Sequence, residues 1–101
     1  MKLKIQSATA NHLISVINLG LTQKGLEKID RAVMHENLIP INTRIRGFWN
    51  RKSKTINISA TQLLCIIKSM NSAQEHLYAQ SSVYVCKHYV IDPLLKQLDE
   101  L

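Results

Sequence analysis

The spacing of apolar side chains along the chain predicts a mostly helical protein. Residues 8–19 carry apolar side chains at helical intervals, and Gly20 is expected to end that helix. Thr22 is a good N-cap for a second helix, which the break predicted at residues 37–40 would end. Residues 2–6 alternate lysine with apolar residues, a pattern that fits either a short strand or a frayed segment.

Capping patterns mark the helices expected in the second half. Ser59 and Gln62 form a capping-box pattern ahead of an apolar helical run. Ser72 and Glu75 repeat this pattern, which indicates a break near residue 71.

The C-terminal third fits two structures. Residues 83–86 are β-prone, whereas the apolar residues within 73–91 fit helical spacing nearly as well. Asp92 and Pro93 are expected to start a last helical turn, with proline at its first position.

Length and composition bound the fold to one compact domain. The 101 residues are 46 % hydrophobic but only 5 % aromatic, so Leu, Ile and Val must fill the core. With 3 Gly and 2 Pro, long loops and a β-sandwich are not expected. We predict an all-α fold, with room for a short N-terminal strand or a small hairpin at residues 43–58.

Targeting signals and cysteine usage predict a cytoplasmic protein without a membrane partner. The chain has no run of about 18 apolar residues that would span a bilayer, and its first residues lack the apolar core of a secretion signal. Cys65 and Cys86 are the two cysteines and form no CxxC pair, so we expect reduced thiols.

The net charge of +6 comes from one acid-free window. No Asp or Glu lies between Glu36 and Glu75, and the charges elsewhere in the chain cancel. The cations of this window are Arg44, Arg46, Arg51, Lys52, Lys54 and Lys68.

Five of these six cations lie within residues 44–54, around the only Trp and the only Phe. A basic cluster with an aromatic anchor is the electrostatic pattern expected of a nucleic-acid surface. A solvated basic face, or a binding site for an acidic protein, would have the same composition.

Residues 43–52, wound as a helix that Asn42 caps, form a recognition-helix pattern. Ile45, Phe48 and Trp49 share one face and would anchor the helix to the core. The opposite and flanking residues would read base edges or bind phosphates. The predicted DNA-binding residues are Thr43, Arg44, Arg46, Gly47, Asn50, Arg51, Lys52 and Lys54.

A β-hairpin is the competing interpretation of the same segment. Residues 43–49 and 55–58 are both β-prone, and residues 50–54 would form the turn. A basic β-ribbon or wing also binds nucleic acid, so the functional expectation is common to both structures.

The order of these segments resembles a known family. Two predicted helices, then Asn42-Thr-Arg-Ile-Arg-Gly-Phe-Trp-Asn-Arg-Lys-Ser, then the capped helix of residues 59–70 is similar to phage-type helix-turn-helix regulators. Small prophage proteins of the lambda CII and YdaT "toxin" kind are similar in length and have a C-terminal helical extension. The resemblance covers residues 8–70, and the segment between Thr22 and Asn42 is longer than the family's second helix and turn.

The resemblance implies sequence-specific binding of double-stranded DNA, transcriptional control in a phage or prophage, and self-association through C-terminal helices. Residues 1–72 would be the DNA-binding region and residues 73–101 the helical oligomerisation region of a single domain. The apolar residues of the C-terminal third spread around its circumference, which independently favours a dimer or tetramer. A phage-type inhibitor that binds a host protein through its basic face is the alternative function.

Other chemistry finds little support in the sequence. His12, His35, His76 and His88 are scattered and lack the ligand spacing of a zinc site. No nucleophile motif accompanies the acidic residues, and no Gly-rich loop is present to bind a phosphate. We therefore expect no enzyme activity, no metal, no cofactor and no small-molecule substrate.

Overall fold

The computed structural model describes residues 1–46 and 52–101, and these are mostly helical, with one small sheet. In chain order the elements are β1 (Lys2–Gln6), α1 (Ser7–Leu21), α2 (Lys28–Arg46), β2 (Ser53–Asn57), α3 (Ala60–Ala73), the 3-10 turn η1 (Leu77–Ala79), α4 (Gln80–Cys86), the π-helical turn η2 (Lys87–Ile91) and α5 (Asp92–Asp99).

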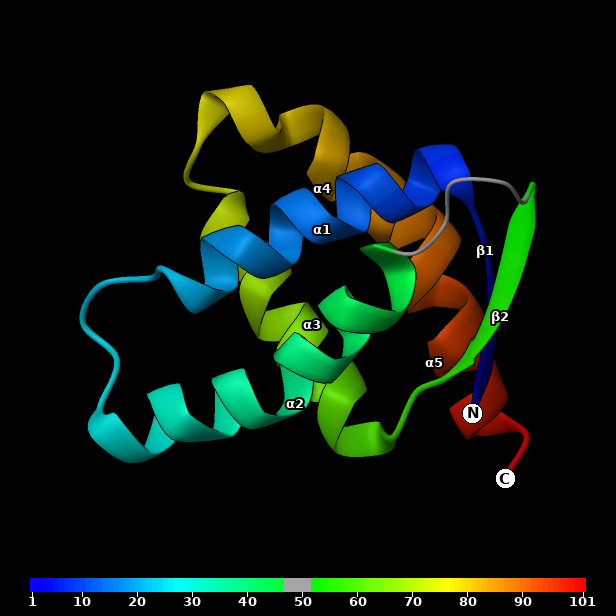
Figure 1. Cartoon of the computed structure of the whole chain (residues 1–101), viewed down its shortest axis with the longest axis horizontal. Coiled ribbons are helices and arrows are strands. Elements are labelled where there is room, and N and C mark those ends of the chain that lie inside the picture. Colours follow the sequence, from blue (N-terminus) through cyan, green and yellow to red (C-terminus); the bar gives the residue numbers. More distant parts are fainter. Residues whose placement is uncertain (47–51) are drawn as a thin grey trace.

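The sheet pairs the start of the chain with its middle. β1 lies antiparallel to β2, with Lys2 opposite Asn57 and Gln6 opposite Ser53, at one edge of the molecule (Figure 1). Of the two structures considered for residues 2–6, the short strand forms and the frayed segment does not. The hairpin considered for residues 43–58 is wrong, because residues 43–46 are helical and the partner of β2 is β1.

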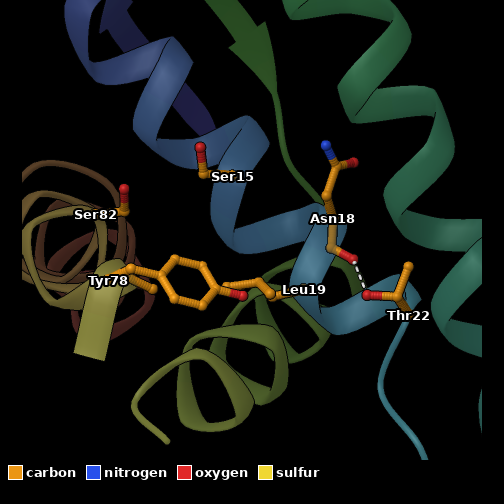
Figure 2. Close-up of a pocket in the computed structure, with 7 residues that line it drawn as sticks. Ser15, Asn18, Leu19, Thr22, Tyr78 and Ser82 are labelled. Carbon is orange, nitrogen blue, oxygen red and sulfur yellow. Dashed lines mark hydrogen bonds between the residues drawn. The ribbon is translucent and has the colours of Figure 1, made fainter. Parts of the chain in front are cut away.

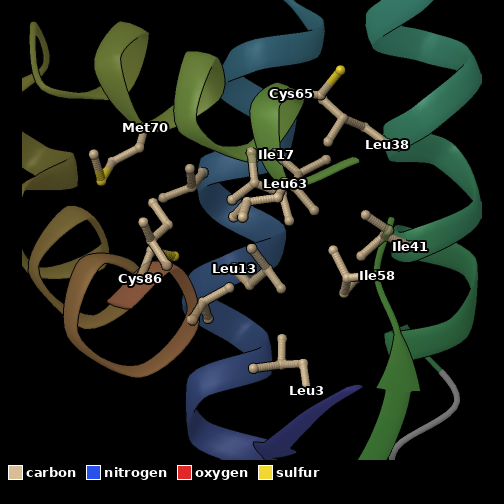
Figure 3. Close-up of a cluster of buried hydrophobic side chains, with 14 of the residues drawn as sticks. Leu3, Leu13, Ile17, Leu38, Ile41, Ile58, Leu63, Cys65, Met70 and Cys86 are labelled. Carbon is tan, nitrogen blue, oxygen red and sulfur yellow. The ribbon is translucent and has the colours of Figure 1, made fainter. Parts of the chain in front are cut away.

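α1 is the central helix of the fold. It packs against α2, α3 and α4, and its residues Leu13, Val16 and Ile17 have no exposed surface (Figure 1). Figure 3 shows side chains from β1, α2, α3 and α4 meeting around this helix. The predicted helix of residues 8–19 is confirmed, and most of the core is indeed aliphatic.

Gly20 does not end α1; it lies inside the helix and is buried. A Cβ at this position would collide with the Oγ and Cβ atoms of Ser69 and lie 3.0 Å from its Cα atom. The glycine is therefore needed because α1 and α3 approach each other closely here. In the sequence, a glycine that serves such a long-range contact looks the same as a glycine that ends a helix.

The prediction that Thr22 caps a second helix is wrong. Thr22 instead ends α1, where its backbone N–H and its hydroxyl both donate to Asn18 O. The turn that follows contains Gly25 at φ 84°, a conformation that glycine adopts without strain, and α2 begins only at Lys28.

The break predicted at residues 37–40 is also wrong, because α2 continues through Pro40. Proline removes one helical hydrogen bond, but Pro40 lies on the exposed side, where water can bind the freed carbonyl. Leu38, Ile41 and Ile45 are buried on the other side and hold the helix to the core across this position. Asn42 is no N-cap: it lies inside α2 and its side-chain amide donates to Asn18 Oδ1 at 3.1 Å.

The start of α3 matches its prediction. Ser59 and Gln62 form the capping box, with both reciprocal hydrogen bonds present. The break predicted near residue 71 is wrong, because α3 runs to Ala73. Ser72 and Glu75 form no capping box: the Glu75 backbone N–H donates to the carbonyl of Ser72.

The C-terminal third is helical rather than β-stranded. Val90, Ile91 and Leu94 join the common core, and Pro93 occupies the first turn of α5 as predicted. Gln97 binds the backbone of Lys2 twice, accepting from its N–H at 3.0 Å and donating to its carbonyl at 2.6 Å. Among the described residues no helix is both long and apolar enough to cross a bilayer.

Gly20→Ala is predicted to destabilise the domain by about 1–3 kcal/mol, because the added methyl group must push α3 away from α1. Chemical denaturation of the wild type, Gly20→Ala, Ser69→Gly and the double variant would measure this. We expect the double variant to lose clearly less free energy of unfolding than the two single variants lose in sum, because Ser69→Gly removes the colliding atoms. Simple additivity would contradict the close contact.

Candidate nucleic-acid interface

The described first four residues of the predicted recognition helix, residues 43–46, belong to α2 and not to a separate helix. Residues 43–46 form the last turn of α2, Lys52 lies in a bend, and Ser53 begins β2. The reason is the apolar spacing of α2, in which Ile41 and Ile45 continue the buried stripe begun by Met34 and Leu38.

The last turn of α2 still presents the predicted polar groups. Arg44 and Arg46 are exposed, and Ile45 between them is buried, as expected for an anchor. Thr43 is exposed, but its hydroxyl donates to Ile39 O at 3.0 Å within the helix. Two guanidinium groups thus project from a turn that the core fixes in place.

Five of the residues singled out in the sequence lie outside the described residues. They are the DNA-binding candidates Gly47, Asn50 and Arg51 and the proposed anchors Phe48 and Trp49.

Lys54 has a structural contact as well as a charge. It pairs across the sheet with Ile5, and its Nζ donates to Arg44 O at 2.8 Å. A cation bound to a carbonyl in the last turn of α2 stabilises the negative end of that helix. Lys52 is exposed.

The sheet adds one lysine, Lys4, that was not among the predicted DNA-binding residues. Lys2 and Lys4 lie on the outward face of β1, while Leu3 and Ile5 point into the core. Lys4 faces Thr55 across the sheet. The alternation of lysine and apolar residues in residues 2–6 is typical of a strand. The pairing of this strand with residues 53–57 is a long-range contact that composition does not show.

A depression of about 370 Å³ brings Lys4 and Lys52 together. Lys4 and Lys52 line it from different segments, and the remaining lining residues are Gln6, Ser7, Ala8 and Ser53. It therefore combines two ammonium groups with two hydroxyls, which are suitable partners for a phosphate oxygen.

No acidic residue belongs to the described segments that form this surface, residues 2–8, 41–46 and 52–58. The acidic residues of α2, Asp30 and Glu36, lie in its first half. We define the basic surface as Lys4, Arg44, Arg46, Lys52 and Lys54. Lys4 and Lys52 share the depression, whereas Lys54 lies on the inner face of the sheet opposite Ile5 and contacts the end of α2 that carries Arg44 and Arg46. This concentration of positive charge on neighbouring segments attracts polyanions.

A second groove, of about 310 Å³, lies between α1 and the C-terminal segment and carries no charge. Figure 2 shows Tyr78 beside Leu19 of α1, with Ser15 and Ser82 at the rim. The serine hydroxyls already bond to Asn11 O and to the His12 ring. This groove is suited to apolar contact rather than to binding an ion.

The cysteines and histidines do not assemble a reactive site. Burial raises the pKa of Cys86 to about 12 and also raises that of Cys65, which the nearby Lys68 lowers in part. Both thiols therefore stay protonated at neutral pH and act as core residues. Within the part of the chain that the structure describes, no three His, Cys, Asp or Glu residues come together as metal ligands.

Comparison of the chain with protein-family models, with curated proteins and with solved structures gives no match.

Lys54→Met is predicted to lower the free energy of unfolding by about 1 kcal/mol, because it removes a charged hydrogen bond from the end of α2. Lys52→Met is the matched control and should change stability by less than about 0.5 kcal/mol, since its side chain is exposed. Thermal melts of both variants would test the difference. Equal melting temperatures would show that the Lys54 contact does not stabilise the helix.

Proposed function

We propose that this chain is a DNA-binding protein, of the phage or prophage regulator class that its sequence resembles. The observation that carries the proposal is the set of cations on segments that contain no Asp or Glu: Lys4 and Lys52 line one depression, and Lys54 binds the turn of α2 that presents Arg44 and Arg46. Cations that release counterions from phosphates supply most of the affinity of proteins for DNA.

The contact surface differs from the separate recognition helix of the original prediction. Arg44 and Arg46 would bind base edges or phosphates from the last turn of α2, and Lys4 and Lys52 would bind a phosphate in the depression that they share. The proposed helix-turn-helix arrangement consists of α1, the turn at residues 22–27 and α2. No catalytic step, metal or cofactor belongs to this proposal, and the protein would act in the cytoplasm.

Self-association is part of the proposal, because one small surface reads few bases. Leu77, Tyr78 and Tyr84 remain 91 %, 77 % and 62 % exposed in the single chain, and Tyr78 also borders the uncharged groove. Exposed apolar groups of this size mark interfaces. Two basic surfaces about 34 Å apart in a dimer would match successive major grooves.

Replacing Arg44 and Arg46 with glutamine is predicted to weaken binding to duplex DNA of all sequences. The slope of log affinity against log salt should become shallower by about two, one unit for each lost phosphate contact. Anisotropy titrations of a labelled random duplex at several salt concentrations would measure this slope.

The matched control for that experiment is Lys24→Gln with Lys96→Gln, which removes the same charge from exposed positions away from the basic surface. The control should keep nearly the wild-type slope. An equal loss in both double variants would show that net charge, not this surface, binds DNA. A wild type without salt-dependent duplex binding would favour the alternative, an inhibitor that docks its basic face on a host protein.

Tyr78→Asp and Leu77→Asp are predicted to convert a dimer or tetramer into monomers while the melting temperature stays near that of the wild type. Both side chains are exposed, so the single chain does not depend on them. Light scattering over a range of concentrations would report the mass. Leu64→Asp on α3, 51 % exposed, is the control and should leave the assembly unchanged. A wild type that stays monomeric at high concentration would contradict self-association.

A further inference from the structure

A second polar depression adjoins the one between Lys4 and Lys52. It has a volume of about 240 Å³, and Thr9 and Tyr89 line it together with β1 residues. Both depressions share Lys4 and Gln6 as lining residues. They therefore form neighbouring parts of one surface where β1 passes into α1.

Tyr89 reaches this surface from the π-helical turn η2, which interrupts the α-helical run between α4 and α5. Such turns insert one extra residue and are found frequently at functional sites. The turn packs against β1, and Tyr89 keeps 59 % of its surface exposed while lining the depression. A partly exposed aromatic side chain thus lines the same depression as Lys4.

The nearby Tyr84 is placed differently, although it is similarly exposed. Its ring lies 4.4 Å from that of His88, measured between centroids, and it lines neither depression. The two tyrosines therefore provide a comparison of the same side chain, in the same helical run, inside and outside the surface.

We propose that the two depressions together bind one unpaired nucleoside-phosphate unit, with the phosphate between Lys4 and Lys52 and the base against the ring of Tyr89. Cations that follow a backbone, beside an aromatic ring on which a base stacks, are the combination used for single-stranded nucleic acid. A base inside a duplex is already stacked on its neighbours, so contact with Tyr89 requires an unpaired one. The inference rests on the proposed function and adds the class of nucleotide that the surface recognises.

The test is the binding of an end-labelled oligothymidylate to wild-type protein and to Tyr89→Leu, followed by fluorescence anisotropy. Loss of base stacking should weaken binding by about five-fold or more. Tyr84→Leu should bind like the wild type, and Tyr89→Trp should keep or improve affinity because it retains an aromatic face. Lys4→Gln should weaken binding more than Lys96→Gln, which removes an equal charge from α5. Melting curves establish that each variant is folded.

A Tyr89→Leu variant that is folded and binds oligothymidylate as tightly as the wild type would overturn the inference. Equal losses in Tyr89→Leu and Tyr84→Leu would overturn it as well. Competition by free thymidine monophosphate distinguishes a free nucleotide from a nucleic-acid strand as the ligand. If the monophosphate displaces the labelled oligothymidylate at a concentration comparable to that of unlabelled oligothymidylate, the site binds a free nucleotide. If the monophosphate does not displace it, the site binds a strand. The titration of random duplex DNA with the Arg44 and Arg46 variants does not depend on the Tyr89 result. Duplex binding can therefore be observed even if Tyr89 makes no contribution to binding oligothymidylate.

Discussion

The pairing of β1 with β2 is the contact on which the rest of the structure depends. It joins residues 2–6 to residues 53–57, and the Met1 amino group extends the link by donating to Ile58 O at 2.9 Å. Without this pairing Lys4 would have no fixed relation to Lys52, and Leu3 and Ile5 would leave the core. Two short strands alone are marginal in water, so the helices that bury their inner face must hold them.

Contacts that are local in sequence were predictable. The capping box at Ser59, the proline at the start of α5 and the periodicity of α1 all depend on residues within one or two turns. The misassigned boundaries depend on partners far away. Gly20 accommodates Ser69, and Pro40 stays helical because flanking residues are buried against other elements. Tertiary packing overrides local preference at such positions.

The same distinction applies to the candidate interface. The window of charge was visible in the sequence, and Ile45 is buried four residues after Ile41, as helical spacing predicts, while Arg44 and Arg46 are exposed. The sequence did not show that Lys54 would bind the end of α2, or that Lys4 would join the surface. Both depend on strand register, which long-range pairing determines. Tyr89 was even less visible, because a π-helical turn has no simple sequence signal.

The two bonds between Gln97 and Lys2 have a consequence for the order of folding. They connect residues 95 positions apart, and β1 itself must wait for a partner about half the chain later. During synthesis, at about 5–20 residues per second, β1 would emerge several seconds before β2 and remain an unpaired edge for that time. Its alternating lysines would then discourage wrong pairing with other chains. The charges that the finished protein presents to a polyanion would thus first protect the nascent chain from aggregation.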